Sequence, residues 1–320
     1  MDGQFIGLDV GGTKIAPAIL ENGRLDVRDT IKTDISDDDA LVGQLVELIA
    51  EHRTDTTVAV GIGLPSIIEF ETGRILHSVN IPLQDLPLRQ VLTEQAGIPV
   101  YLENDASCAA LAEAYDEEGE LTSPDLVMFT VGTGVGGGLV LGGRLYRGTT
   151  SAFEVGHTVI GLDLENGAPE PEGKHPLPGT LEYCAAGTAL DRLAEREARD
   201  EQDSFLGKRL TQDGEVTGHD VVDGAKAGDA DALRVIHILG QRLGIGIANA
   251  INLFDLREIV VGGGVSVAGD LLLDPARETA KRYTVPGLGT KTTIRLAHHG
   301  VRAGVLGAAM VAAHEEERTS

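Results

Sequence analysis

The chain has 320 residues and a mass of 33.6 kDa, which is enough for two domains, and 42% of its residues are hydrophobic. Fifty acidic residues against 26 basic ones give a net charge of −24, which argues against nucleic-acid and anionic-membrane binding because phosphate groups repel such a surface. Only seven of the basic residues are lysine. This composition predicts adaptation to high salt, with an ordinary acidic cytosolic protein as the alternative.

The N-terminal sequence and the cysteines predict a cytoplasmic protein. Residues 1–10 contain neither the basic nor the long apolar region of a signal peptide. Cys108 and Cys184 fit no metal-ligand spacing, and a reducing compartment explains them most simply. The longest uncharged run, residues 126–143, contains seven glycines, which is typical of strands and turns and not of a membrane helix.

The first third of the chain alternates strand and helix patterns. Two glycine-containing turns, at residues 11–13 and at Asn22-Gly23, separate three apolar runs, and Asn-Gly between apolar runs is typical of a β-hairpin. Apolar residues then recur at helical spacing. The predicted elements are strands at 4–10, 14–20, 25–32, 57–65 and 98–104, and helices at 38–52, 86–96 and 105–116.

The pattern of the first hairpins recurs after Pro124. LVMFTVG corresponds to FIGLDVG at an offset of 121 residues, and GGRL at 142–145 corresponds to NGRL at 22–25, which predicts a duplicated α/β domain. The later predicted elements are a loop at 163–178, helices at 181–199, 221–227, 230–254 and 303–316, and a strand at 257–263. We expect domains at 1–120 and 121–302, with the last helix returning to the first.

The turn Asp9-Val-Gly-Gly-Thr-Lys14 has the composition of a phosphate-binding loop. Gly11 and Gly12 leave backbone N–H groups unobstructed, Thr13 adds a hydroxyl and Lys14 a positive charge. Asp9 ends the strand and is a candidate Mg²⁺ ligand, since Mg²⁺ is commonly held by one or two carboxylates together with substrate phosphates. A plain hairpin turn is the alternative interpretation.

A second glycine loop, Gly132-Thr133-Gly134 with its following glycines, formally contains the dinucleotide-binding pattern G-x-G-x-x-G. That fold requires a helix directly after the glycines, whereas the residues that follow here have a strand pattern. We therefore expect a second phosphate-facing hairpin that pairs with the first.

Glu103-Asn104-Asp105 lies at the junction of a predicted strand and a predicted helix. A carboxylate at a helix N-terminus is favoured in its ionised form, and Asp105 could accept a hydroxyl proton during phosphoryl transfer. Simple capping of the helix by Asn104 or Asp105 is the alternative.

Two further groups of residues suggest ligand contacts. Glu154, His157 and Glu182 combine carboxylates and an imidazole near glycines, which suits hydrogen bonds to sugar hydroxyls; a metal held by His157, His175 and an acid, or a structural His157, are the alternatives. Gly262, Gly263 and Gly264 follow a predicted buried strand and could leave room for a flat nucleoside base, or could form a tight strand-to-helix turn.

Read in order, DVGGTK, ENDA, GTGVGGG, E-x-G-H and NLFD…IVVGGGVS resemble the ROK family of sugar kinases and related repressors, over residues 5–309. The resemblance implies two actin-like (ribonuclease H-like) α/β domains, with ATP and sugar in the cleft between them. It implies Asp105 as the catalytic base, Gly11–Lys14 and Gly132–Gly134 as phosphate loops, and Gly262–Gly264 as the adenosine loop. The implied sugar contacts are Asn80, Asn104, Asp105, Glu154, His157 and Glu182, and Asp9 would lie near Mg²⁺.

One departure from the family concerns zinc. Many members carry a C-x-C-G-x-x-G-C-x-E motif, and alignment on Glu182 places Gly173, His175 and Thr180 where the three cysteines would be. Only His157 and His175 remain as ligands, whereas structural Zn²⁺ normally takes four. We therefore expect no zinc site.

The resemblance implies an ATP- and Mg²⁺-dependent kinase that phosphorylates a hexose at O6, with glucose favoured, in a homodimer or homotetramer. Kinases for fructose, mannose, allose, N-acetylglucosamine or N-acetylmannosamine are the alternatives within the family. A sugar-sensing repressor would need a DNA-binding module and a basic patch, but only eight residues precede Asp9. A scaffold ATPase of the same superfamily would not need the predicted sugar contacts.

Overall fold

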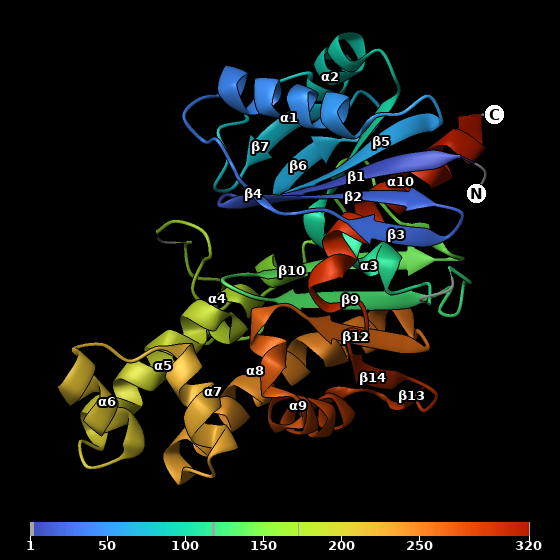
Figure 1. Cartoon of the computed structure of the whole chain (residues 1–320). Helices are drawn as coiled ribbons and strands as arrows, with labels where there is room; N and C mark the ends of the chain where they lie inside the picture. The colour runs from blue at the N-terminus through green and yellow to red at the C-terminus, as the bar shows by residue number, and fades with distance from the viewer. Residues whose placement is uncertain (1–2, 117–118, 172, 320) are drawn as a thin grey trace. The chain divides into compact units, whose positions relative to one another are not determined.

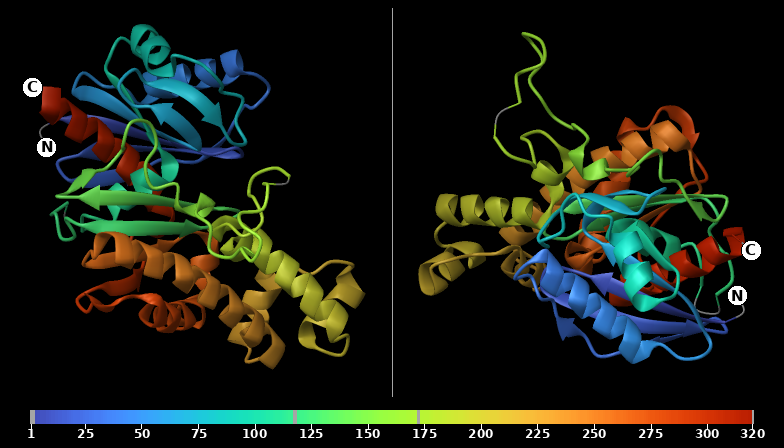
Figure 2. Two further views of the ribbon diagram at one scale, coloured as in Figure 1. Left: turned by 180° about the vertical axis from the view of Figure 1, so that it is seen from behind. Right: turned by 90° about the horizontal axis from the view of Figure 1, so that it is seen from above.

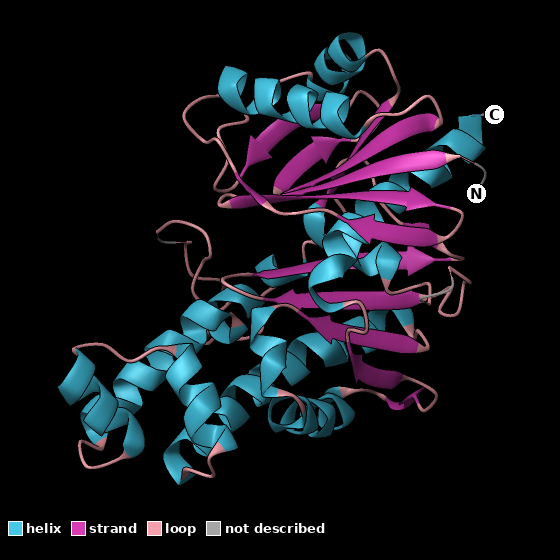
Figure 3. Cartoon of the chain, in the orientation of Figure 1, coloured by secondary structure: helices cyan, strands magenta, loops and turns pink. Residues whose placement is uncertain are grey.

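The computed structural model describes residues 3–116, 119–171 and 173–319, and the chain divides into two compact units. One unit comprises residues 1–128, 138–153 and 298–320, and the other comprises residues 129–137 and 154–297. Both combine helices and strands (Figure 3), as the predicted α/β class requires. None of the described helices is both long and apolar enough to cross a membrane.

The sheet of the first unit has the order β3-β2-β1-β5-β8, with β4 paired to β2 (Figure 1). Its strands are β1 (Gln4–Val10), β2 (Lys14–Glu21), β3 (Arg24–Val27), β4 (Ile31–Lys32), β5 (Thr57–Leu64) and β8 (Val100–Asn104). The predicted hairpin is confirmed: β2 pairs antiparallel with β3, and Asn22 and Gly23 both have positive φ, as the tightest hairpin turns require. Strands β1, β5 and β8 are parallel neighbours.

Helices cover both faces of this sheet. One face carries leucine, isoleucine and valine side chains that pack against α1 (Asp38–His52) and α2 (Leu88–Ala96). The other face packs against α3 (Asp105–Ala112) and α10 (Ala303–Thr319). Helix α10 lies along the sheet in all the views (Figures 1 and 2).

A separate hairpin of β6 (Ser66–Glu69) and β7 (Arg74–Ser78), which the sequence pattern does not predict, follows β5.

A second sheet has the order β11-β10-β9-β12-β14, which corresponds strand by strand to the first. This correspondence agrees with the duplication predicted from the repeated glycine hairpins. Its strands are β9 (Leu126–Val131), β10 (Val135–Leu141), β11 (Arg144–Leu145), β12 (Glu258–Gly262) and β14 (Thr293–Leu296); β13 (Pro286–Gly289) precedes β14.

Six of the described α-helices belong to the second unit. They are α4 (Leu181–Ala185), α5 (Gly187–Asp200), α6 (Phe205–Asp213), α7 (Gly218–Lys226), α8 (Ala230–Phe254) and α9 (Asp270–Tyr283). Short 3₁₀ turns occur at η1 (Val155–His157) and η2 (Gly264–Ala268), and in the first unit at η3 (Gly300–Arg302).

The single helix predicted at 181–199 is wrong. Ala186 has an extended backbone and separates α4 from α5. The N–H of Gly187 donates to the carbonyl of Gly132 at 2.7 Å, so a distant turn takes the hydrogen bond that a continuous helix would have kept for itself.

Candidate functional site

Three parallel strands bring Asp9, Glu103 and Asp105 of the first unit to one edge of the sheet. Asp9 of β1 is in register with Gly63 of β5, which is in register with Glu103 of β8. Asp105 begins the next helix, and the carboxyl ends of parallel strands are the usual place for ligands in α/β proteins. Asp9 and Asp105, far apart in the sequence, therefore lie at the same edge.

This proximity affects the pKa of Asp9. Burial and, to a smaller extent, the negative charge of Asp105 raise the pKa of the Asp9 carboxyl from 3.8 to about 6, while Lys14 opposes the shift. A partly buried carboxylate beside a second one is a place where a cation would relieve charge repulsion. Such a pair therefore suits a divalent metal bound to phosphates.

The residues between β8 and α3 cap that helix. The side-chain oxygen of Asn104 accepts hydrogen bonds from the N–H groups of Ala106 and Ser107 at 3.0 and 3.2 Å. Oδ1 of Asp105 accepts from Ala106 at 2.8 Å. The capping interpretation of Asn104 is thus confirmed, and it leaves Asp105 at the first position of the helix.

The glycine turn after β1 is a hairpin turn closed by the N–H of Gly11, which donates to the carbonyl of Lys14 at 2.9 Å. Thr13 and Lys14 are exposed. A β-carbon on Gly12 would lie 2.7 Å from the carbonyl oxygen of Asn80, so only glycine permits this approach. The structure therefore brings Asn80 to the first glycine turn, and phosphate binding by that turn stays a prediction.

The second glycine turn belongs to the second unit and is fixed by Glu182. The N–H of Val135 donates to Oε2 of Glu182 at 2.8 Å, and a side chain on Gly134 would overlap that carboxylate. On the other side of the turn, Gly187 donates to Gly132. The Glu182 side chain thus belongs to the phosphate-loop candidate as well as to the predicted sugar contacts.

Glu154 and His157 lie beside this turn. Both side chains are exposed at η1, and Gly156 between them packs so closely on the carbonyl of Val135 that a side chain there would overlap it. A β-carbon on Gly156 would also lie 3.4 Å from the β-carbon of Glu182. The structure therefore groups Glu154, His157 and Glu182, which are separated by up to 28 residues in the sequence.

The imidazole rings of His157 and His175 also meet, edge to face, with centroids 5.2 Å apart. Within residues 3–116, 119–171 and 173–319, no group of three His, Cys, Asp or Glu side chains is arranged to hold a metal ion.

The run Gly262–Gly264 begins at the last residue of β12 and approaches the end of β9. Gly263 has a φ of +88° and its missing β-carbon would lie 2.5 Å from the carbonyl oxygen of Val131, the residue before Gly132. Gly263 and Gly264 are exposed. The predicted adenosine loop and the second glycine turn are therefore neighbours within the second unit. The predicted site residues form two such groups, one in each unit.

Sequence reasoning missed Arg147, which holds the Glu103–Asp105 segment. Its Nε donates to Oε2 of Glu103 at 2.5 Å and its Nη1 to Oε1 of Glu315 at 3.0 Å. The other oxygen of Glu103 accepts from the N–H of Asn104 at 3.0 Å. Arg147 is separated from Glu103 by 44 residues, and no sequence motif connects them.

Comparison with known proteins identifies relatives along nearly the whole chain. The model of the ROK family matches residues 5–315. The glucokinase of Halalkalibacterium halodurans is 36% identical over 325 aligned positions, covering 98% of this chain and 96% of the relative. A ROK hexokinase structure from Thermus thermophilus is 32% identical with a TM-score of 0.79 and covers 98% of this chain and 99% of that one. A ROK family glucokinase from Streptomyces griseus, solved with glucose and AMPPNP, is 31% identical with a TM-score of 0.77, covering 98% and 100%.

Proposed function

The chain belongs to the ROK family, and from this premise we propose that it transfers the γ-phosphoryl group of ATP to O6 of a hexose, with glucose as the preferred substrate. Full-length similarity to the glucokinases supports the substrate, and the AMPPNP in one of those structures supports ATP as donor. The observation that carries the proposal is Asp105, at the first position of α3 and close enough to Asp9 to raise its pKa.

In this proposal Asp105 accepts the proton of the O6 hydroxyl as the phosphorus–oxygen bond forms. Phosphoryl transfer proceeds through a loose transition state, so proton transfer comes late and an ordinary carboxylate suffices as base. Asn104, Glu154, His157 and Glu182, with Asn80, hold the sugar hydroxyls. Charged and bidentate hydrogen bonds of this kind orient O6 toward the γ-phosphorus.

The two glycine turns hold the phosphates through backbone N–H groups, and Gly262–Gly264 hold the adenosine. Asp9 would hold Mg²⁺ together with the phosphates, and the bound Mg²⁺ would neutralise charge on the transferred phosphoryl group. We assign no structural zinc, because cysteine is missing from residues 173, 175 and 180. We further propose a cytoplasmic, salt-adapted homo-oligomer.

The test is a coupled ADP-release assay at several KCl concentrations with glucose, fructose, mannose, allose and the two N-acetylhexosamines. Asp105→Asn should lower kcat by roughly 10²–10⁴-fold, the usual contribution of a general base. The matched control is Asp38→Asn, because Asp38 likewise begins a helix and accepts from the next N–H, at 3.0 Å, but is exposed on α1. ADP release that is independent of sugar, or an Asp105→Asn variant as active as Asp38→Asn, would exclude the proposal.

A further inference from the structure

Gly304, in the first turn of α10, lies directly against the side chain of Asp9. A β-carbon on Gly304 would lie 2.5 Å from Oδ2 and 2.7 Å from Cγ of Asp9. Atoms that are not bonded do not approach so closely, so the carboxylate occupies its present position only because residue 304 has no side chain. Gly304 was not among the residues predicted to contribute to the site.

The backbone of helix α10 packs directly against backbone atoms of β1, β5 and α3. Side chains on Gly7 of β1 or Gly61 of β5 would overlap carbonyl oxygens of α10, those of Val305 and Ala308. A side chain on Gly307 would overlap the carbonyl oxygen of Cys108 in α3. A shift of α10 away from Asp9 would open these close contacts, and the dense packing of a protein interior disfavours such a gap.

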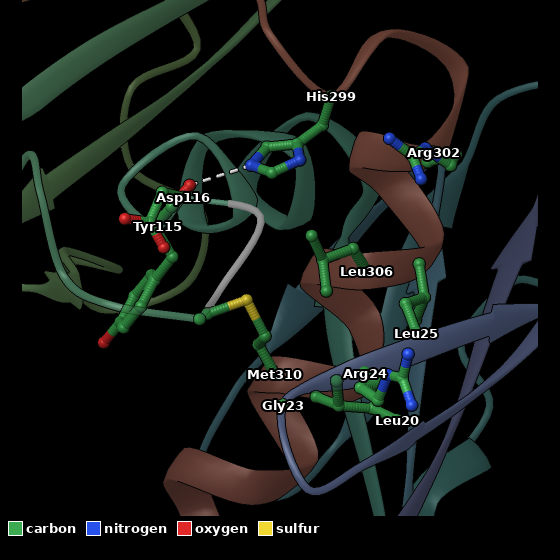
Figure 4. Close-up of a pocket in the computed structure, with 11 residues that line it drawn as sticks. Leu20, Gly23, Arg24, Leu25, Tyr115, Asp116, His299, Arg302, Leu306 and Met310 are labelled. Atoms are coloured by element: carbon green, nitrogen blue, oxygen red, sulfur yellow. Dashed lines mark hydrogen bonds between the residues drawn. The ribbon is translucent and has the colours of Figure 1, made fainter.

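The start of α10 is also anchored by His299. Its backbone N–H donates to Oε1 of the buried Glu113 at 2.8 Å, and its Nε2 lies 2.8 Å from the carbonyl oxygen of Tyr115, the contact dashed in Figure 4. Glu113 and Tyr115 directly follow α3, the helix that begins with Asp105. The helix that carries Gly304 is therefore fixed to the helix that carries the proposed base.

The contact with Asp9 is separate from the cavity on the other side of α10. Arg302, Leu306 and Met310, spaced four residues apart, line a cavity of about 230 Å³ in the first unit (Figure 4). Gly304 is offset from Leu306 by two residues, or about 200° around the helix, so the two face opposite sides of α10. A side chain added at residue 304 would point toward Asp9 and not into the cavity, and the three atoms nearest to its β-carbon belong to the Asp9 carboxylate. Because this carboxylate ends a rotatable side chain, we expect it to be the group that moves.

We propose that Gly304 is a positioning residue that fixes the Asp9 carboxylate and thereby sets how tightly the enzyme holds the divalent cation of its ATP complex. The inference rests on the proposed function for its kinetic part. Its steric part, the coupling of residue 304 to Asp9, is independent of any activity.

The experiment is a double-mutant cycle of Gly304→Ala, Asp9→Ala and the double variant, with Gly43→Ala as the matched control. Gly43 is also a helical glycine, in α1, but a β-carbon there meets no atom within 4 Å. Gly304→Ala should raise the Mg²⁺ concentration that gives the half-maximal rate. It should also lower kcat by about 100-fold, which is the typical effect of displacing a group of the active site by 1 Å. The KM for glucose should stay within about twofold, and Gly43→Ala should behave as wild type.

Thermal unfolding in EDTA provides the readout that needs no activity. Gly304→Ala should lower Tm when Asp9 is present but not in the Asp9→Ala background, where the added methyl group has room, so the two effects should be non-additive. An equal loss of Tm in both backgrounds, or a folded Gly304→Ala enzyme with wild-type rate and Mg²⁺ requirement, would overturn the inference. If wild type phosphorylates no hexose, the proposed function fails, while the unfolding cycle still tests the contact.

Discussion

The backbone N–H of Val135 donates a 2.8 Å hydrogen bond to Oε2 of Glu182. One carboxylate oxygen of Glu182 therefore holds the turn after β9, a predicted phosphate loop. The carboxylate is also a predicted sugar contact, so a single side chain connects the proposed sugar and ATP subsites of the second unit.

This relationship predicts different outcomes for two substitutions of Glu182. Glu182→Gln keeps an acceptor for Val135, so Tm should change little while the KM for sugar rises by about 10- to 100-fold through loss of a charged hydrogen bond. Glu182→Ala leaves the Val135 N–H without its acceptor and should destabilise the fold by about 1–3 kcal/mol as well. Thermal unfolding and steady-state kinetics measure the two effects. Equal Tm values for the two variants would contradict the role of Glu182 in the turn.

Arg147 should contribute far more stability than an exposed arginine. It pairs with Glu103 and Glu315, whose side chains are only 8% and 5% exposed. Arg147→Met leaves these carboxylates with less compensating charge, and removal of one partner of a buried pair costs about 3–5 kcal/mol. Arg318 also pairs with Glu315 at 2.8 Å, so we expect the lower end of that range.

The control is Arg28→Met, because Arg28 pairs with Asp26 at 2.9 Å but both side chains are largely exposed. Such surface pairs contribute about 0–1 kcal/mol. Urea unfolding compares the two variants. A similar loss of stability in both would show that Arg147 does not hold the Glu103–Asp105 segment.

Asp9 should destabilise the metal-free protein at neutral pH. Its pKa is raised from 3.8 to about 6, so the folded state binds the proton more tightly than the unfolded state. The resulting cost is absent below about pH 4, grows between about pH 4 and 6, and is fully present above that. Because one pKa unit corresponds to about 1.4 kcal/mol, the cost is about 3 kcal/mol.

Asp9→Asn should therefore be more stable than wild type at pH 7.5 in EDTA, and the difference should vanish near pH 4. Unfolding of both proteins across this range measures it, and the comparison cancels the pH dependence of all other groups. A difference that is constant with pH would contradict the raised pKa. The same substitution should abolish most of the proposed activity, because it removes the Mg²⁺ ligand.

The net charge of −24 predicts that stability rises with salt. Screening reduces repulsion between the carboxylates, and the Debye length falls from about 10 Å at 0.1 M to about 3 Å at 1 M salt. Tm measured in KCl should increase toward molar concentrations. A maximum below about 0.2 M would contradict adaptation to high salt.

Local sequence patterns predict the parts of the fold that depend on neighbouring residues. Asn22-Gly23 predicts its hairpin because both residues tolerate positive φ. The break between α4 and α5 could not be predicted, because it depends on the hydrogen bond from Gly187 to Gly132, 55 residues away. Helix α9 could not be predicted either, because it contains Pro275, and proline disfavours a helix interior. Its packing against α8, which forms only in the folded chain, accompanies the helix.

The candidate site shows the same division. Asp9, Asp105 and Glu182 could be selected because they lie in short motifs. Arg147 and Gly304 could not, because their importance comes from contacts with Glu103 and Asp9 that form only in the folded chain.

The most direct test of the central claim is to identify the product formed from glucose and ATP by ³¹P and ¹³C NMR, with Asp105→Asn in parallel. We expect phosphate on C6 alone, in a one-to-one ratio with ADP, and a rate reduced by roughly 10²–10⁴-fold in the variant. Inorganic phosphate in place of a sugar phosphate, or phosphorylation at another carbon, would contradict it.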